Sequence, residues 1–403
     1  MRRTALTVLA LSLFCSVAFA ADDWTQHGGP NRDFSVGPQK LSQDWGEKGP
    51  KTVWEQKLGD GFSAIVTDGK TLYTHYRKEG KEIVVALDAK SGETKWEYGY
   101  DVPIPDVQYL STQYGEGPQA TPLLVDGKLV TFGFMGHLTC VDAKTGELEW
   151  AHALGETNEV PVLYFGHSAS PLSIGKNVVV AADGLLAFDL ASGELVWENR
   201  ELDGTYGSPI LHENGSIVTP LDGHLAAFNA KSGKLLWKVE HKNQWGTLLH
   251  TPVVDDSGRV VLSAAQNGTI IVDPAQKEQA PLWTTKKMQV GHSNIVLHDD
   301  YVYGSTGDAS TFIVATSLKD GSQAWKERGF GRTNFIKVGE QFLMLDFDAK
   351  LALVELSPEG MKIITQTTIG DQPTWTPPTL IGTTLYFRDE DRIAAFDLGK
   401  SGD

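Results

Sequence analysis

ALDAKSGETKW, the stretch at residues 86–96, returns along this chain in three close copies. The copies are CVDAKTGELEW, AFDLASGELVW and AFNAKSGKLLW, which end at Trp150, Trp197 and Trp237. Looser copies end at Trp283 and Trp325, and neighbouring copies lie 40 to 54 residues apart. Such self-similarity indicates a repeat architecture, in which each unit buries its apolar face against the next. The stretch therefore decides the fold, and function is expected where the copies differ.

Each copy is interpreted as a strand, a turn and a returning strand. In the first copy the Asp88 side chain can accept hydrogen bonds from the amides that follow, and Gly92 supplies the positive φ that the turn needs. Trp96 then lies on the outermost strand, where its ring fills the gap between neighbouring sheets. We assign structural roles to the equivalent residues of all the close copies: Asp88, Gly92, Trp96, Asp142, Gly146, Trp150, Asp189, Gly193, Trp197, Gly233 and Trp237.

A second signal, a short apolar strand followed by a two-residue turn and another strand, precedes the copies. The turns recur eight times, at 68–69, 126–127, 174–175, 214–215, 257–258, 299–300, 338–339 and 381–382, and the Asp-Gly and Asn-Gly pairs among them are strong hairpin signals. Four antiparallel strands per unit predict an all-β, eight-bladed β-propeller. The last unit lacks a returning strand, so the orphan strand at residues 52–58 is expected to complete it and close the ring. Seven blades is the alternative, if a degenerate unit is absorbed.

Residues 1–20 have the pattern of a secretory signal peptide, with a basic start, an apolar stretch and the small-x-small sequence Ala18-Phe19-Ala20. We expect cleavage near Ala20, a lead-in segment at 21–50, the propeller at 51–403 and a periplasmic or secreted location. The chain carries 51 acidic and 35 basic side chains, a net charge of −16, which disfavours nucleic acid and anionic lipid as partners. No other apolar run reaches the length of a membrane span, so direct membrane insertion is not expected.

The two cysteines indicate neither a disulfide nor a nucleophile. Cys15 lies inside the signal, and its flanking residues do not fit a lipoprotein cleavage site, so direct lipid anchoring is not expected. Cys140 takes a strand position that holds Ala, Ile or Leu in other copies, which favours a small buried apolar role. The histidines are scattered, and we predict no metal site; five are interpreted as surface or turn residues: His75, His152, His212, His241 and His298.

The pattern A-x-D-x-x-[ST]-G-x-x-x-W resembles the repeat of the pyrroloquinoline-quinone-binding-like propellers, and residues 24–33 resemble their lead-in. The resemblance covers residues 24–398. This family includes quinoprotein alcohol dehydrogenases and the propeller lipoprotein of the outer-membrane barrel assembly machine. For a dehydrogenase, the resemblance implies a vicinal cysteine pair against the quinone, a calcium site of Glu, Asn and Asp, and a catalytic aspartate. One mature cysteine cannot make that pair, so no cofactor is expected, and pyrroloquinoline quinone with calcium is the alternative.

The innermost strands begin with chemically varied residues. Each starts with Ser or Thr, often followed by Pro, and first strands line the central channel of a propeller. Just before that register, beside Phe62, lie side chains that suit a small polar or anionic ligand at the channel mouth: Gln119, His167, Tyr206, His250, His292, Arg332 and Trp375. The alternative is that they bind channel waters and fix the register of the strands.

Two connections that enter the same face are unusually long, at residues 97–118 and 151–167. Long aromatic loops on a rigid scaffold are typical of partner recognition, and the candidate partner-binding residues are Tyr100, Tyr109, Tyr114, Tyr164 and Phe165. The alternative is a cap packed over the channel mouth.

Taken together, these features predict an exported, non-catalytic propeller that serves as a protein-binding or scaffolding platform in the bacterial cell envelope. Its expected partner is an envelope or secreted protein. The alternative is a small-ligand-binding or quinone-dependent oxidoreductase propeller that uses the channel mouth.

Overall fold

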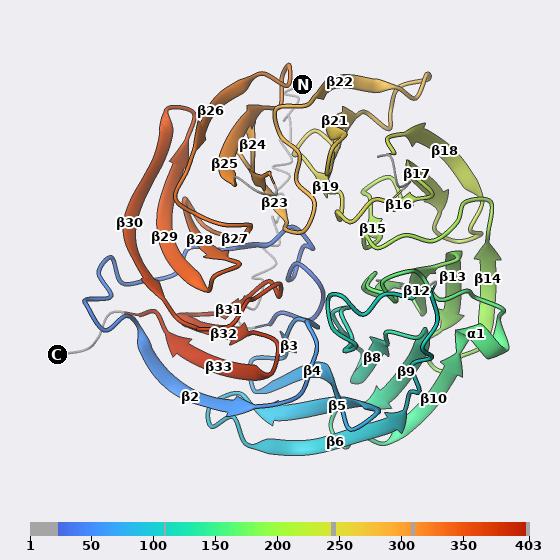
Figure 1. Ribbon diagram of the computed structural model, residues 1–403. Helices are drawn as coiled ribbons and strands as arrows, with labels where there is room; N and C mark the ends of the chain where they lie inside the picture. Colours follow the sequence, from blue (N-terminus) through green and yellow to red (C-terminus); the bar gives the residue numbers. More distant parts are fainter. Residues whose placement is uncertain (1–22, 109, 243–246, 308–310, 400–403) are drawn as a thin grey trace, which may run out of the picture.

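The computed structural model describes residues 23–108, 110–242, 247–307 and 311–399. Eight β-sheets surround a central axis, and the chain visits them in order around the ring (Figure 1). The predicted eight-bladed β-propeller is confirmed, and the alternative of seven blades is wrong. The predicted signal peptide at residues 1–20 lies outside the described residues.

Each blade is a four-stranded antiparallel meander whose first strand is innermost. Blades 1 and 2 contain β3 (Val66–Thr67), β4 (Thr71–Lys78), β5 (Lys81–Asp88), β6 (Thr94–Asp101), β7 (Leu123–Val125), β8 (Lys128–Phe132), β9 (His137–Asp142) and β10 (Leu148–Ala153). Helix α1 (Leu154–Thr157) follows blade 2. Blades 3 and 4 contain β11 (Leu172–Ile174), β12 (Asn177–Ala182), β13 (Gly184–Asp189), β14 (Leu195–Asn199), β15 (Ile210–Leu211), β16 (Ser216–Leu221), β17 (His224–Asn229) and β18 (Leu235–Glu240).

Blades 5 and 6 contain β19 (Val253–Val254), β20 (Val260–Ala264), β21 (Gly268–Val272), β22 (Pro281–Thr285), β23 (Ile295–His298), β24 (Tyr301–Thr306), β25 (Phe312–Ser317) and β26 (Gln323–Glu327). Blade 7 contains β27 (Thr333–Val338), β28 (Gln341–Asp346), β29 (Lys350–Ser357) and β30 (Gly360–Thr368), and blade 8 contains β31 (Thr379–Ile381), β32 (Thr384–Arg388), β33 (Arg392–Asp397) and β2 (Lys51–Lys57). Apolar clusters fill the space between neighbouring sheets; Cys140 of β9, for example, packs with Val178 and Val180 of β12. Among the described residues, no helix is long and apolar enough to cross a membrane.

The repeated stretch joins each blade to the next. Within the first copy, Asp88 Oδ1 accepts hydrogen bonds from the amides of Lys90 and Ser91 at 3.0 and 3.1 Å. Trp96 Nε1 reaches blade 2 and donates to the Ala143 carbonyl at 3.1 Å. The Trp96 ring also covers Gly146, where an added Cβ would lie only 2.6 Å from the ring. The glycine is therefore needed twice, for its positive φ of 75° and for the space that the tryptophan takes.

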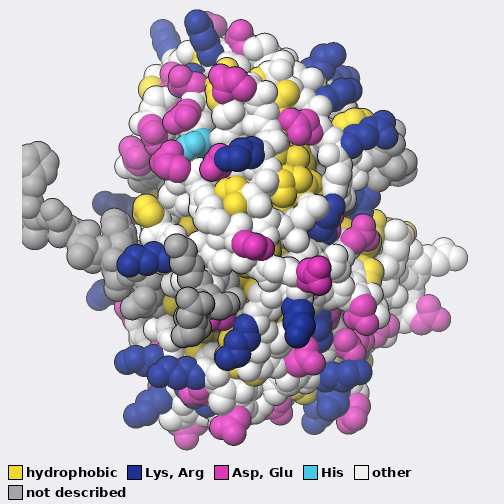
Figure 2. All heavy atoms as spheres, turned by 90° about the vertical axis from the view of Figure 1, so that its left-hand side faces the viewer, with side chains coloured by type: hydrophobic (Ala, Val, Ile, Leu, Met, Phe, Trp, Pro, Cys, Tyr) yellow, Lys and Arg dark blue, Asp and Glu magenta, His cyan; other side chains and the backbone are white. Residues whose placement is uncertain are grey.

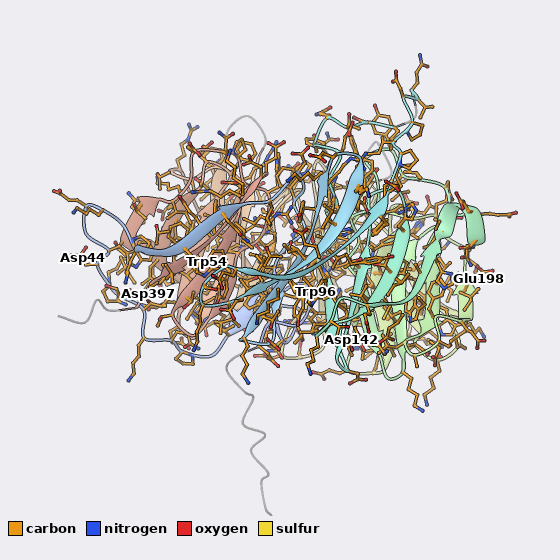
Figure 3. All side chains as sticks on the ribbon, turned by 90° about the horizontal axis from the view of Figure 1, so that it is seen from below. Asp44, Trp54, Trp96, Asp142, Glu198 and Asp397 are labelled. Carbon is orange, nitrogen blue, oxygen red and sulfur yellow. The ribbon has the colours of Figure 1, made fainter. Side chains whose placement is uncertain are left out.

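Closure of the ring repeats this contact with a residue from the other end of the chain. Strand β2 pairs antiparallel with β33, which completes blade 8 as predicted. Its Trp54 covers Gly92 of blade 1 and donates to the Ala89 carbonyl at 3.1 Å, as Trp96 does one blade further on (Figure 3). The fully buried Arg388 of blade 8 strengthens the joint, because its Nη1 donates to the Ser63 and His75 carbonyls at 2.9 and 2.8 Å.

The lead-in segment adds a strand that the sequence did not predict. Strand β1 (Ser35–Val36) pairs parallel with β27, so blade 7 has five strands. Further upstream, Trp24 is buried and forms a bridge with Thr67 of blade 1. The lead-in therefore crosses from blade 1 to blade 7, on the side of the ring opposite the long loops.

The interpretation of five histidines as surface or turn residues is wrong for His75, His212, His241 and His298, which are buried. Three of the five side chains reach glycine carbonyls: His152 Nε2 contacts Gly193 O at 2.7 Å, His212 Nε2 contacts Gly258 O at 2.8 Å and His241 Nε2 contacts Gly268 O at 3.0 Å. The sequence pattern could not show this, because the acceptors belong to the next blade. His152, His212 and His241 thus connect neighbouring sheets and have a structural role.

Acidic and basic side chains are interspersed on the outer wall formed by blades 6 to 8, with apolar atoms in small separate groups (Figure 2). Exposed apolar residues occur singly on the outermost strands, among them Val53, Leu148, Leu236 and Ile363. Isolated exposed apolar side chains are normal for a folded protein and indicate no binding site by themselves.

We expect Gly146→Ala to destabilise the propeller more than Gly127→Ala. Both glycines belong to blade 2 and share a φ of 75°, so alanine costs about 1–2 kcal/mol of backbone strain at each. Only Gly146 lies under a tryptophan, whereas nothing lies within 4 Å of a Cβ at Gly127, so overpacking adds about 1–3 kcal/mol at Gly146 alone. Chemical denaturation of the two variants measures the difference in stability. Equal midpoints would show that overpacking against the tryptophan adds nothing to the backbone strain at Gly146.

Candidate functional site

The first strands of blades 2 to 5 are joined around the channel by their leading hydroxyl residues. The amide of Thr121 donates to Ser170 Oγ at 3.0 Å, that of Ser170 to Ser208 Oγ at 2.9 Å, and that of Ser208 to Thr251 Oγ1 at 3.2 Å. We call these four residues the hydroxyl belt. Because each bond connects two blades, the belt sets the register of neighbouring first strands. These bonds give the hydroxyl residues that begin the first strands a structural role, and they do not test the neighbouring residues predicted to bind a ligand.

The channel mouth that faces the viewer in Figure 1 is here called the front mouth. Tyr114, from a long loop, lies there among rings from three other segments. The Tyr114 ring lies 5.3 Å from Phe165, 5.8 Å from Trp375 and 6.0 Å from His292, measured between ring centroids. Arg332 stacks over Trp375 at 5.1 Å. Rings from three other segments therefore contact Tyr114, while the Arg332 guanidinium lies over the face of Trp375.

The structure brings some of the predicted ligand-binding residues together and separates others. His292, Arg332 and Trp375 share the aromatic cluster, with His292 and Trp375 rings 5.4 Å apart. Gln119 and Tyr206 instead hold the second long loop: Gln119 Nε2 donates to the Phe165 carbonyl, and the Phe165 amide donates to Tyr206 Oη, both at 3.3 Å. Ligand binding by these five residues stays a prediction.

The remaining two predicted residues, His167 and His250, are buried. His167 packs its ring 4.9 Å from Phe132 of blade 2, and burial lowers its pKa to about 4. His250 donates from Nδ1 to the Thr251 carbonyl at 2.9 Å, and burial likewise lowers its pKa to about 4. Both rings are therefore neutral at physiological pH.

The two long connections join into one surface, which we call the front cap and define as residues 102–108, 110–118 and 154–167. Both connections begin later than the sequence predicted, because residues 97–101 continue β6 and residues 151–153 continue β10. The Ser111 amide donates to the Tyr164 carbonyl at 2.6 Å. The cap rises above the rim of the ring in the view of Figure 3. Of its predicted partner-binding residues, Tyr164 is 52% exposed, whereas Tyr114 and Phe165 turn toward the channel and Tyr109 lies outside the described residues.

Tyr100, the fifth predicted partner-binding residue, is held by buried groups at the base of the cap. Its hydroxyl donates to Glu82 Oε2 at 2.7 Å and contacts His75 Nε2 at 3.2 Å. Glu82 is fully buried, and burial raises its pKa to about 7 although the Phe134 amide also donates to it at 2.9 Å. Nearby, Arg77 donates from Nη1 to the Val102 carbonyl at 2.9 Å, which fixes the start of the first loop. The cap thus stands on a buried polar base.

The opposite, back mouth contains two side chains that sequence reasoning missed, His27 and Arg32 of the lead-in. His27 lies between hydroxyls of blades 2 and 5, with Nδ1 3.2 Å from Thr121 Oγ1 and Nε2 3.4 Å from Thr251 Oγ1. It therefore completes a closed circuit with the hydroxyl belt. The only sequence signal was the lead-in pattern at residues 24–33, which indicated a family and not a position inside the channel.

The described residues do not fit a quinone with its calcium ion. They contain no group of three or more His, Cys, Asp or Glu that could hold a metal. Cys140, at 0% exposure, lies in the core between blades 2 and 3, where burial raises its pKa to about 11, so it presents no thiolate at either mouth. The Arg332 guanidinium already lies over the Trp375 ring, at 5.1 Å. We derive no chemistry through such a cofactor.

Comparison with known families gives a match over most of the chain. The family model described as outer membrane protein assembly factor BamB matches residues 43–239 and 108–327. The protein of that name from Yersinia pestis is 24% identical over 296 residues, which cover 67% of this chain and 68% of the relative. The one from Bordetella pertussis is 22% identical and covers 85% of both chains.

Solved structures share the fold at lower identity. BamB from Moraxella catarrhalis superposes with a TM-score of 0.66 and 17% identity, over 86% of this chain and 99% of that one. A europium-containing methanol dehydrogenase superposes with a TM-score of 0.71 and 12% identity, over 91% of this chain and 89% of that one. At these identities the superpositions show the fold alone, which a binding protein and an enzyme share.

We expect the propeller to lose stability as the pH falls from 7 to 5, and His27→Gln to reduce that loss. Burial lowers the pKa of His27 from its ordinary 6.5 to about 3. Between these values the unfolded chain binds the proton and the folded chain does not, so stability falls as the pH falls, by at most about 1.4 kcal/mol per pH unit for this group. Denaturation midpoints at pH 5 and pH 7 measure the effect.

The matched control is His224→Gln, because His224 is half-exposed and contacts only the local Asp222 carbonyl. It should keep the pH dependence of the wild type. The prediction is contradicted if His27→Gln and His224→Gln lose the same stability between pH 7 and pH 5.

Proposed function

The chain belongs to the family described as outer membrane protein assembly factor BamB, and we propose that it is a non-catalytic, protein-binding platform in outer-membrane protein assembly. The family match, over residues 43–239 and 108–327, carries this proposal. The relatives from Yersinia pestis and Bordetella pertussis bear the same name. A rigid ring of blades with long loops on one face suits a scaffold that presents a docking surface.

We further propose that the chain is exported and acts in the periplasm or outside the cell. The signal-peptide pattern of residues 1–20 supports this, with cleavage near Ala20. The partner is then an envelope or secreted protein. Amino-terminal sequencing of the protein recovered from the periplasm of its native host tests the proposed cleavage.

The front cap is the proposed docking surface. It is fixed at its base by Arg77 and across its middle by the bond between Ser111 and Tyr164, so it can present one shape to a partner. Its exposed side chains include Tyr164 and three prolines, which contribute apolar contact area at low entropic cost: Pro103, Pro105 and Pro161.

The charge of the front cap indicates which kind of partner surface would fit it. The cap carries four acids and no lysine or arginine; the acids are Asp106, Glu116, Glu156 and Glu159, of which Glu116 lies 3.5 Å from Arg77 of blade 1. An acidic surface with apolar centres fits a partner that presents basic residues around an apolar patch, because complementary charge steers association and disfavours other partners.

We expect Tyr164→Ala to weaken partner capture at least about tenfold, which corresponds to about 1.4 kcal/mol. The exposed half of the side chain is available for burial in an interface, and its removal should leave the propeller folded because the ring lies on the cap, outside the blades. Capture of envelope proteins by the tagged full chain, quantified by mass spectrometry and repeated at raised salt, gives the measurement.

Leu236→Ala is the matched control, since Leu236 is 50% exposed on β18 and lies outside the front cap. It should capture the same proteins as the wild type. Equal capture by Tyr164→Ala and wild type would exclude the front cap as the docking surface. If the wild type itself captures no component of outer-membrane protein assembly, the proposed function is wrong.

A further inference from the structure

Arg32 is a buried cation inside the propeller channel. The residue is only 6% exposed. Neutral acceptors of blade 3 and of the lead-in bind its guanidinium. Nη1 donates to the Pro171 carbonyl at 3.0 Å and to Gln26 Oε1 at 3.3 Å, and Nη2 donates to the Ser170 carbonyl at 3.5 Å. Nε is buried and has no hydrogen-bond partner among the described residues.

Among the described residues, no carboxylate compensates the charge of Arg32. Burial lowers the pKa of Arg32 to about 9, and no neighbouring acid acts against that shift. Asp33 follows directly in sequence, but its carboxylate accepts bonds from the amide and hydroxyl of Ser35 at 2.9 and 2.7 Å instead. A buried charge without a counter-charge is costly, because neutral acceptors replace only part of its hydration.

Arg388 provides a comparison within the same molecule. It is equally buried and is also held by backbone carbonyls, those of Ser63 and His75. For Arg388, however, Asp389 and Asp60 lie close enough to raise its pKa against the effect of burial. Among the described residues, carboxylates thus lie near Arg388 and not near Arg32.

The carbonyls that hold Arg32 lie next to hydroxyl donors of the hydroxyl belt, because one of these carbonyls belongs to Ser170. Ser170 and Ser208 each use Oγ to accept an amide bond within the hydroxyl belt, so each hydroxyl proton remains to donate. No protein acceptor for either proton occurs among the described residues. His27, which closes the circuit between Thr121 and Thr251, is neutral because burial lowers its pKa to about 3.

We propose that the channel binds a small inorganic anion of halide size beside Arg32, within the circuit formed by the hydroxyl belt and His27. Arg32 supplies the compensating positive charge through Nε, and the hydroxyls of Ser170 and Ser208 supply neutral donors. A halide accepts bonds from several directions and so fits a ring of donors that lacks any carboxylate. The anion offsets the cost of burying Arg32, and it fixes the lead-in across the axis of the ring.

Bromide locates such a site directly, because its anomalous scattering distinguishes it from water. Crystals of the wild-type chain grown in sodium bromide should show an anomalous peak in contact with Arg32 Nε and next to Ser170 or Ser208. A channel that holds only water at this place, or bromide peaks confined to the protein surface, would overturn the proposal. This measurement needs no variant.

Stability in chloride gives a second test, in solution. At constant ionic strength, replacement of gluconate by chloride should raise the thermal midpoint by about 2 °C when chloride exceeds its dissociation constant about tenfold. Arg32→Gln should abolish this shift, because it removes the charge and keeps a polar side chain. Sulfate and phosphate, which are larger than the proposed site, should give no shift in the wild type.

Arg388→Gln is the matched control. It removes a buried arginine that carbonyls also hold, so it should lower the midpoint in both salts yet keep the shift between them. If Arg32→Gln responds to chloride as the wild type does, the anion does not bind at Arg32. If Arg32→Gln fails to fold, the bromide experiment on the wild type still decides the question.

Discussion

The contact between a tryptophan ring of one blade and a turn glycine of the next is the constraint on which this structure depends. Trp54 covers Gly92, Trp96 covers Gly146, and the same contact continues with Trp150 on Gly193 and Trp197 on Gly233. A single four-stranded blade cannot bury both of its faces, so each blade needs its neighbours. The tryptophan ring packs against the outer part of the next blade and excludes water there. Because the contact points in one direction around the ring, the last blade must also supply a tryptophan. Trp54 of strand β2 meets that need, and the two ends of the chain thereby share one blade.

The inner wall of the ring is held by a different kind of interaction. At the outer joints apolar contact dominates, whereas around the channel the hydroxyl belt connects first strands that are only two or three residues long. Such short strands make few ladder bonds of their own, so bonds between blades are what fix their positions. The lead-in then crosses the axis, with His27 bonded to two members of the belt. Both mouths are consequently filled by the chain itself, the front by Tyr114 and the back by His27 and Arg32.

The repeat predicted the architecture well, because its signals are local. An aspartate that caps a turn, a glycine with positive φ and a tryptophan eight residues after the aspartate interact with residues at fixed short distances or with the same place in the next copy. The site was predicted less well, because its residues meet only in three dimensions. The sequence placed Trp375 and His292 at one mouth but could not show that Tyr114 lies against both. Nor could it show that buried histidines reach carbonyls of the next blade, since the acceptor is a backbone atom that leaves no mark in the sequence.

The difference between the repeated segments and the long connections supports the proposal that partner recognition resides outside the repeat. Residues that hold neighbouring blades cannot vary without opening a joint, so specificity has to reside in segments that the ring does not need. The front cap is such a segment: its base is fastened by Arg77 and Tyr100, and its tip departs from the repeat in length, charge and composition. With Tyr114 filling the channel mouth beneath it, the cap presents an outer surface in place of an open cavity. The proposed docking of a partner at the cap fits this arrangement, because a rigid scaffold avoids the entropic cost of ordering a docking surface on binding.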